Sequence, residues 1–234
     1  MLVRDWMTRN VVTIDIDGSM DEAIRLMKEH KVRKLPVMKR GKLAGIITDR
    51  DIKRASASDA TTLDIHELLY LISKIKVKNI MTRDPISVPV DFTVEETAEL
   101  MMRKKISGVP VLDAKGDVVG IISESDIFRV LISLTGIGKG GVQFAFRLED
   151  RPGSIKDVTD VIRAHGGRMA SILSAYDRAP QGYRLVYIRS FGIDRVRLPE
   201  LIKALKAQAA LLYVVDHREN QRQIFEEEVT DAKV

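Results

Sequence analysis

Two hydroxyl–carboxylate pairs carry the most suggestive chemistry in this chain. Thr48 precedes Asp51 by three residues, and Ser123 precedes Asp126 by the same spacing. Each pair follows a glycine and a short apolar strand, and each opens a predicted helix. The N-terminus of a helix presents free N–H groups and the positive end of its dipole, which attract phosphate. A carboxylate can accept hydrogen bonds from both hydroxyls of a ribose. The pairs therefore favour polyhydroxylated or anionic ligands.

The same spacing has a purely structural interpretation. A hydroxyl residue followed three positions later by an acidic one is typical of a helix capping box. Capping alone contributes about 0.5–2 kcal/mol of stability per helix. Capping and ligand binding are compatible, because both use the free N–H groups of the first turn. Both interpretations stay open at this stage.

Basic residues stand near one of the pairs. Arg33 and Lys34 precede Leu35 in the first half, and cations there would pair with a phosphate. They would equally suit an exposed helix end, where basic side chains favour the dipole. The second half has Ser107 and Gly108 at the same place. We therefore predict two unequal sites, the one with Thr48 and Asp51 being the more cationic.

The two pairs belong to an internal repeat. Met7-Thr8-Arg9 returns as Met81-Thr82-Arg83, 74 residues later, and Leu35-Pro36-Val37 returns as Val109-Pro110-Val111. One inserted residue then raises the offset to 75 through the glycine, the strand and the hydroxyl–carboxylate pair. Matches that keep their order over this length indicate a duplication.

Each repeat is expected to form a β-α-β-β-α unit, because apolar strand-like runs alternate with helical periodicity. One unit would leave apolar surface open, so two should pack as a pair. The first repeat should hold strands 11–16, 34–38 and 42–48, with helices opened by Ser19 and by Asp49. The second should hold strands 86–90, 108–112 and 117–123, with helices 93–105 and 124 to about 134.

Residues 57–78 connect the repeats, which we place at 1–56 and 79–134. Small polar residues are followed by a predicted helix at 66–76 with an apolar stripe. We expect this helix to pack the units together or to join a dimer. A DNA-binding helix is the alternative, but its lysines make only a small basic patch.

Residues 135–141 are rich in glycine. They formally contain G-x-G-x-x-G at Gly136, Gly138 and Gly141. A dinucleotide site needs a strand before this motif and a helix after it. Here the order is reversed, so we interpret the segment as a flexible linker.

Residues 142–217 predict a second domain with the order β-α-β-β-α-β. Its strands are expected at 142–148, 169–176, 183–191 and 210–216, with helices from about 155 and over 199–207. This order is that of a ferredoxin-like split βαβ fold. Asp150 would cap the first helix and Pro152 would lie in its first turn. Residues 218–234 are interpreted as a polar tail, either a helical extension or a loose end.

Both parts resemble known families. Met-Thr, a capped helix, Leu/Val-Pro-Val and Gly-Ile-Ile-Thr/Ser-x-x-Asp resemble the cystathionine-β-synthase (CBS) domain, and two copies over residues 1 to about 134 resemble a Bateman module. Asp150-Arg151-Pro152-Gly153 resembles the first turn of an ACT domain, an amino-acid-sensing regulatory fold. The order of domains is similar to that of acetoin-utilisation-type CBS–ACT proteins.

The resemblance implies a regulatory sensor of an adenosine-containing ligand such as AMP, ATP or S-adenosylmethionine. The hydroxyl–carboxylate pairs would contact ribose and phosphate. The residues that would flank the adenine are Val11, Val12, Pro85, Ile86, Leu35 and Val109. The ACT-like domain would add amino-acid sensing at Asp150, Arg151, Pro152 and Gly153, or dimerisation. Both families imply a homodimer that acts on an unidentified regulated protein.

The amino-acid composition limits which classes of protein and of functional site this chain can represent. The 234 residues are 45% hydrophobic and 30% charged, which supports buried cores. The absence of Cys excludes disulfides and thiolate chemistry, and the four His have no metal-site spacing. We expect a soluble cytoplasmic protein that is not an enzyme and has no metal and no membrane span. The net charge of +5 is too weak to predict nucleic-acid binding. A ligand-free scaffold remains the main alternative.

Overall fold

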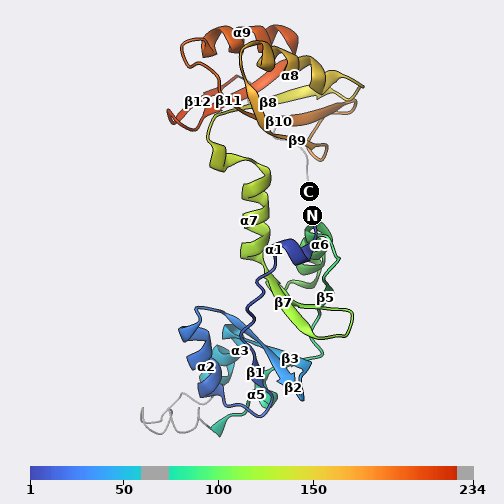
Figure 1. Cartoon of the computed structure of the whole chain (residues 1–234), viewed down its shortest axis with the longest axis vertical. Helices are drawn as coiled ribbons and strands as arrows, with labels where there is room; N and C mark the ends of the chain where they lie inside the picture. The colour runs from blue at the N-terminus through green and yellow to red at the C-terminus, as the bar shows by residue number, and fades with distance from the viewer. Residues whose placement is uncertain (59–73, 226–234) are drawn as a thin grey trace. The chain divides into compact units, whose positions relative to one another are not determined.

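The computed structural model describes residues 1–58 and 74–225. The helix expected at 66–76 lies almost entirely outside the described residues. The chain divides into two compact units, residues 1–128 and 129–234. The first contains both repeats up to residue 128, and the second contains the rest of the helix 124–134, the linker and the C-terminal domain (Figure 1).

The first repeat folds as a β-α-β-β-α unit. Its elements are β1 (Ile14–Asp15), α2 (Met20–Glu29), β2 (Lys34–Lys39), β3 (Lys42–Thr48) and α3 (Asp49–Ser58). Ser19 caps α2, since its Oγ accepts from the Glu22 N–H at 3.1 Å. The strand expected over 11–16 is wrong in length, because only two of its residues pair with β2.

The second repeat has the same topology. Its elements are β5 (Val88–Pro89), α6 (Val94–Lys104), β6 (Gly108–Leu112), β7 (Val118–Ser123) and α7 (Glu124–Leu134). A full capping box formed by Thr93 and Glu96 opens α6. The apolar residues of both repeats lie on the inner sides of the helices and strands, with Leu35 and Val109 fully buried at equivalent places.

The segment before each repeat packs on the other repeat. Near α1 (Val3–Trp6), the Val3 N–H donates to Phe92 O at 2.8 Å, and Thr8 bridges to Ile121 in β7. Conversely, α5 (Val77–Ile80) packs on the first core and β4 (Thr82–Arg83) pairs with β3. The two repeats therefore exchange segments, so each repeat is completed by residues from outside its own block of 1–56 or 79–134.

Two glycines permit this exchange. A Cβ at Gly45 would lie 2.6 Å from Met81 Sδ and 2.9 Å from Thr82 O. A Cβ at Gly120 would overlap Met7 Sδ. The recurrence of Met-Thr and of glycine in the two repeats therefore has one cause: each Met-Thr lies against the glycine of the other repeat.

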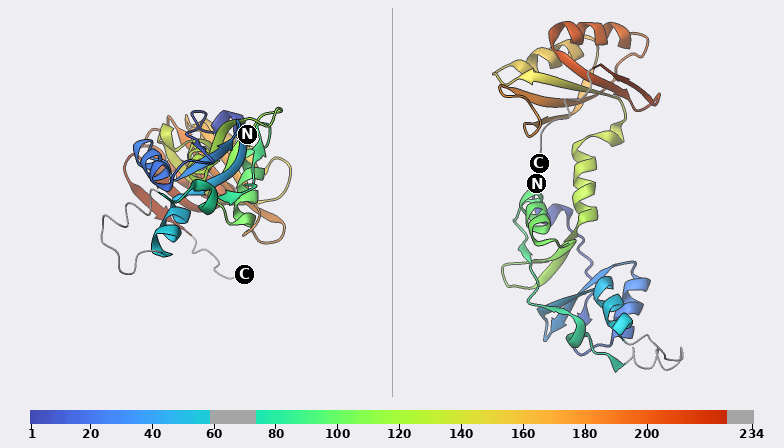
Figure 2. Two further views of the ribbon diagram at one scale, coloured as in Figure 1. Left: turned by 90° about the horizontal axis from the view of Figure 1, so that it is seen from below. Right: turned by 180° about the vertical axis from the view of Figure 1, so that it is seen from behind.

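The C-terminal domain is a five-stranded sheet with helices on one side (Figure 2). Its elements are β8 (Val142–Glu149), α8 (Ser154–Ala164), β9 (Arg168–Ala175), β10 (Tyr183–Phe191), α9 (Leu198–Gln208), β11 (Ala210–Asp216) and β12 (Gln221–Ile224). The strand order is β12-β11-β8-β10-β9. The four strands β11-β8-β10-β9 and the two helices give the expected split βαβ arrangement. Phe144, Phe146, Ile162 and Leu201 lie in its core.

Three sequence expectations for this part are corrected. Helix α8 begins at Ser154 with Gly153 as N-cap at φ 86°, so Asp150 does not cap it and Pro152 lies outside it. Residues 221–224 form β12 against β11 rather than a tail. The linker contains a short 3₁₀ helix, Ile137–Lys139, and is held at Thr135 O by Ser171 Oγ at 2.8 Å.

No helix in the described ranges combines the length and the apolar character needed to cross a bilayer.

Candidate functional site

Both hydroxyl–carboxylate pairs form capping boxes. The N–H and Oγ1 of Thr48 donate to Asp51 Oδ2 at 2.9 and 2.7 Å. The N–H and Oγ of Ser123 donate to Asp126 Oδ2 at 2.7 and 2.6 Å. The structural interpretation of the spacing is therefore confirmed. In each box the cap uses one carboxylate oxygen.

The two boxes differ in exposure. The Asp51 side chain is 13% exposed, and its Oδ1 lies 3.9 Å from Nη1 of the exposed Arg54. Asp126 is 1% exposed. A ligand at Asp51 could therefore use Oδ1 directly, whereas access to Asp126 depends on the side chains around it.

Lys34 links the two repeats. Its Nζ donates to Ser107 Oγ at 3.0 Å, so a side chain of β2 ends beside the second repeat. Lys34 pairs with Thr48 in the first sheet, and Gly108 pairs with Ser123 in the second, so Lys34 and Gly108 are equivalent. A Cβ at Gly108 would lie 2.5 Å from Lys34 Nζ. The glycine therefore leaves the space that Lys34 occupies.

Charges of the second box surround this lysine. Burial lowers the pKa of Lys34, while the carboxylates of Glu124, Asp126 and Asp49 oppose the decrease. Our assignment of Lys34 to the site of Thr48 and Asp51 is therefore corrected, because it reaches the second box. Arg33, by contrast, is exposed.

A cleft of about 430 Å³ lies beside the second box. This volume falls within the range of small-molecule sites. Its polar lining includes Arg50, Lys105, Ser107 and Glu124, and its apolar lining comes from α6 and α7. Sequence reasoning missed Arg50 and Glu124 as site residues. The sequence held a signal for both, because each lies between the hydroxyl residue and the aspartate of its motif.

The proposed adenine-flanking residues are placed unequally. Leu35 and Val109 are 0% exposed as whole residues, so their side chains belong to the core and neither side chain nor backbone is open to a ligand here. Val11, Val12 and Pro85 are half-buried, and Ile86 is 37% exposed. Val12 packs against the core of the first repeat.

In the C-terminal domain, the loop of Asp150 to Gly153 is tied down by charge pairs. Arg151 donates to Asp157 Oδ2 at 2.9 Å and to Glu149 Oε2 at 3.1 Å, and these carboxylates raise its pKa. Arg184, which sequence reasoning missed, donates to Ser154 Oγ at 3.0 Å and lies 3.7 Å from Asp150 Oδ1. Within the described residues, no three His, Asp or Glu side chains gather as a metal site.

Comparison with known proteins gives consistent matches over the repeats. The CBS domain family matches residues 3–58 and 77–133. A CBS domain-containing protein of Dictyostelium discoideum is 33% identical over 135 residues, which is 57% of this chain and 93% of that protein.

Solved structures match the same part. The crystal structure of a candidate acetoin utilization protein (AcuB) from Vibrio cholerae is 29% identical with a TM-score of 0.50, covering 59% of this chain and 96% of the other. The CBS domain pair of protein MJ0100, solved with 5′-methylthioadenosine and S-adenosyl-L-methionine, is 34% identical with a TM-score of 0.49, covering 56% and 99%.

Proposed function

The chain belongs to the CBS-domain family, and from that premise we propose that it is a regulatory protein whose CBS pair binds an adenosine-containing ligand. AMP, ATP and S-adenosylmethionine are the ligand candidates. The observation that carries this proposal is the pair of capping boxes with Lys34 reaching from one repeat to the other.

Each box offers the groups that a nucleotide needs. The first turns of α3 and α7 provide N–H groups for a phosphate. The Asp51 and Asp126 carboxylates supply acceptors for ribose hydroxyls, and hydrogen bonds to charged groups contribute about 1.5–3 kcal/mol each. Lys34 and Arg50 provide positive charge near the second box, where Lys34 bonds Ser107 and Arg50 lines the cleft.

The two sites are unequal in this proposal. The second box has Lys34 from the other repeat, whereas the first box has Gly108 at the equivalent position. A phosphorylated ligand therefore prefers the second box. A less anionic ligand such as S-adenosylmethionine is better suited to the first.

Regulation follows from the position of α7. This helix begins at the second box and continues into the linker, whose Thr135 O accepts from Arg189 Nε at 2.7 Å. A ligand that prefers one arrangement of the α7 N-terminus can shift the C-terminal domain only by its difference in affinity for the two states.

A thermal-shift screen of the whole chain tests the proposal. A ligand at 100 times its dissociation constant should stabilise the protein by about 2.7 kcal/mol. Inorganic triphosphate at equal charge controls for non-specific anion effects. No shift with AMP, ATP or S-adenosylmethionine contradicts the proposal and favours the ligand-free scaffold.

Exposed apolar side chains support a homodimer. Met102 is 80% exposed on α6 and Phe128 is 60% exposed on α7, and both line the 430 Å³ cleft. Covering such residues with a second copy would bury apolar surface. Light scattering should give twice the chain mass, and Met102→Glu with Phe128→Ser should give the monomer. An unchanged dimer would place its interface elsewhere.

The C-terminal domain is the candidate second sensor. Arg184 beside the loop of Asp150 is a half-buried guanidinium suited to the carboxylate of an amino acid. Adding the twenty amino acids to the thermal-shift screen tests this role. If none shifts the transition, dimerisation is the role left for the ACT-like domain.

A further inference from the structure

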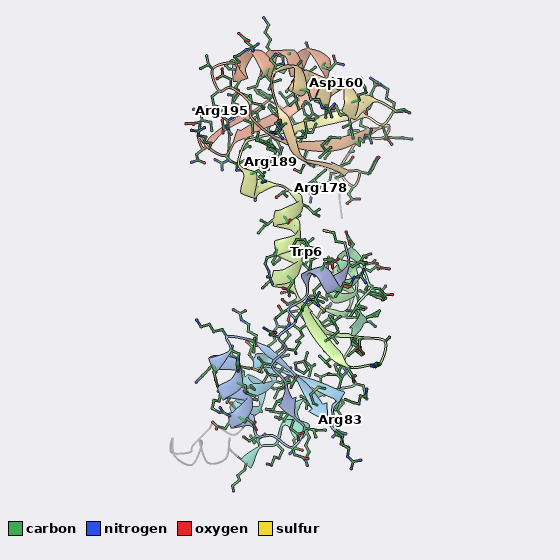
Figure 3. All side chains as sticks on the ribbon, in the orientation of Figure 1. Trp6, Arg83, Asp160, Arg178, Arg189 and Arg195 are labelled. Atoms are coloured by element: carbon green, nitrogen blue, oxygen red, sulfur yellow. The ribbon has the colours of Figure 1, made fainter. Side chains whose placement is uncertain are left out.

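A buried arginine in the C-terminal domain has only neutral hydrogen-bond partners. Arg189, on β10, is 4% exposed. Its Nε donates to Thr135 O at 2.7 Å, and its Nη2 donates to Gln143 Oε1 at 2.9 Å. Burial lowers the pKa of this guanidinium, and only Tyr213 opposes the decrease among the described groups. Figure 3 shows Arg189 where the linker meets the sheet.

Two buried nitrogens in this region make no hydrogen bond. They are Arg189 Nη1 and His217 Nε2. The Nε atoms of Arg184 and Arg195 also make none, but they lie 3.7 and 2.6 Å from carboxylate oxygens. Arg189 and His217 have no such acidic neighbour within ion-pair distance in the described part of the chain. A buried polar nitrogen without a partner is costly, so these two nitrogens indicate a partner that the described residues do not provide.

Strand register places the two side chains in one region. Arg189 pairs with Gln143, and Gln143 pairs with Val215 on the next strand. His217 follows the end of β11 directly, and Arg189 is near enough to lower the pKa of its ring. The His217 N–H donates to Gly141 O at 3.2 Å, which keeps it beside the linker.

The charges around His217 are mostly positive. Its pKa is lowered by burial first, then by Arg189 and Arg222, while Asp216 opposes the decrease. Asp216 is committed elsewhere, because Arg195 Nη2 donates to it at 3.1 Å and the Arg218 N–H at 3.0 Å. The region is therefore rich in donors and positive charge.

We propose that Arg189 and His217 form a binding site for a small oxyanion, a carboxylate or a phosphate group, held between the guanidinium Nη1 and the imidazole Nε2. The anion accepts one hydrogen bond from each nitrogen, and His217 takes up a proton when the anion binds. The glycine-rich linker from 135 to 141 borders the site, because Thr135 O accepts from Arg189 and Gly141 O accepts from the His217 N–H. This site is separate from the CBS pair and does not rest on its ligand.

Nuclear magnetic resonance of the histidine rings in the whole chain tests the proposal. Inorganic phosphate and acetate are titrated in separate arms at constant ionic strength. Either anion should raise the pKa of His217 to a plateau, because a bound anion favours imidazolium, and His30, His66 and His165 should not follow. If only phosphate or only acetate raises the pKa of His217, that anion identifies the class of ligand as a phosphate or a carboxylate. No plateau with either anion overturns the proposal.

Substitutions separate binding from structure. Arg189→Gln should abolish the response of His217, whereas Arg163→Gln, a change of an exposed arginine on α8, should keep it. If Arg189→Gln does not fold, His217→Gln provides the second measurement. Its affinity for the effective anion, measured by calorimetry, should fall roughly tenfold or more. An unchanged response in Arg189→Gln or unchanged affinity in His217→Gln overturns the site.

Discussion

The ammonium group of Lys34 lies 3.0 Å from Ser107 Oγ, so a side chain of the first repeat ends in the second. The equivalent position in the second repeat is Gly108, which has no side chain to place in return. A duplicated sequence has therefore produced an unsymmetrical pair of boxes. A lysine at both positions would place two cations in one space.

Lys34→Gln should weaken phosphorylated ligands at the second box. Loss of a charged contact corresponds to roughly 10–150-fold in affinity. The affinity of S-adenosylmethionine should change less, because it carries no phosphate. Calorimetry of the whole chain measures both. Lys39→Gln, at the other end of β2, is the matched control. Equal losses for AMP and S-adenosylmethionine would contradict a phosphate role for Lys34.

Asp126→Asn should separate capping from ligand recognition. Asparagine can still accept from Ser123, so the change in unfolding free energy should stay below about 1 kcal/mol. The lost charge should nevertheless weaken nucleotide binding at the second box. Glu96→Gln alters the capping box of α6, which belongs to neither site, and should leave ligand affinity unchanged. If Asp126→Asn and Glu96→Gln change the ligand affinity equally, Asp126 acts only as a helix cap and does not contact the ligand.

Gly45→Ala should destabilise the protein more than Gly120→Ala. The new Cβ at position 45 meets the backbone oxygen of Thr82 at 2.9 Å, whereas the three atoms nearest to the new Cβ at position 120 all belong to the flexible side chain of Met7. Overpacking typically costs about 1–3 kcal/mol. Chemical denaturation measures both, and Met7→Ala should rescue Gly120→Ala. Failure of that rescue would mean that the Met7 contact is not the cause.

Acid should remove the stabilisation from Asp216. Burial raises its pKa, but the hydrogen bonds from Arg195, Arg218 and Glu219 outweigh burial, so the folded pKa lies below the usual value. The contribution is therefore complete above the unfolded pKa of about 3.9 and is lost as pH falls through the folded value.

Asp216→Asn should accordingly cost up to roughly 3–5 kcal/mol near pH 7, because it leaves Arg195 without its counter-ion. The difference from the wild type should begin to shrink near about pH 4, where the carboxyl of the unfolded wild type becomes protonated, and should shrink further as pH falls through the lower folded pKa. Unfolding curves across that range measure this, with Asp21→Asn at an exposed position of α2 as control. A pH-independent difference would assign the effect to packing.

Local pattern was sufficient for most of the fold. Strands β10 and β11 have the predicted bounds, because alternating apolar residues and flanking turns fix both ends. The spacing of the hydroxyl and carboxylate residues predicted the starts of α3 and α7, because a capping pair marks the first turn of a helix. Strand β12 was missed, because its burial is low and only its backbone pairing with β11 defines it.

The site was only partly predictable. The hydroxyl–carboxylate motif located the boxes, yet the side to which Lys34 points depends on packing between repeats, which spacing within one repeat does not encode. The exchange of segments and the burial of Leu35 and Val109 also depend on packing between elements, so spacing within one repeat did not predict them. Arg189 and His217 are 28 residues apart in the sequence and meet only through strand register.

Calorimetric titration of the whole chain with AMP, ATP and S-adenosylmethionine decides whether the two boxes bind the ligand, using the wild type, Asp51→Asn, Asp126→Asn and the double variant. Each single substitution should weaken binding at one box by roughly 10–150-fold, and the double variant should lose measurable binding. Wild-type affinity in the double variant would contradict ligand binding at the two boxes.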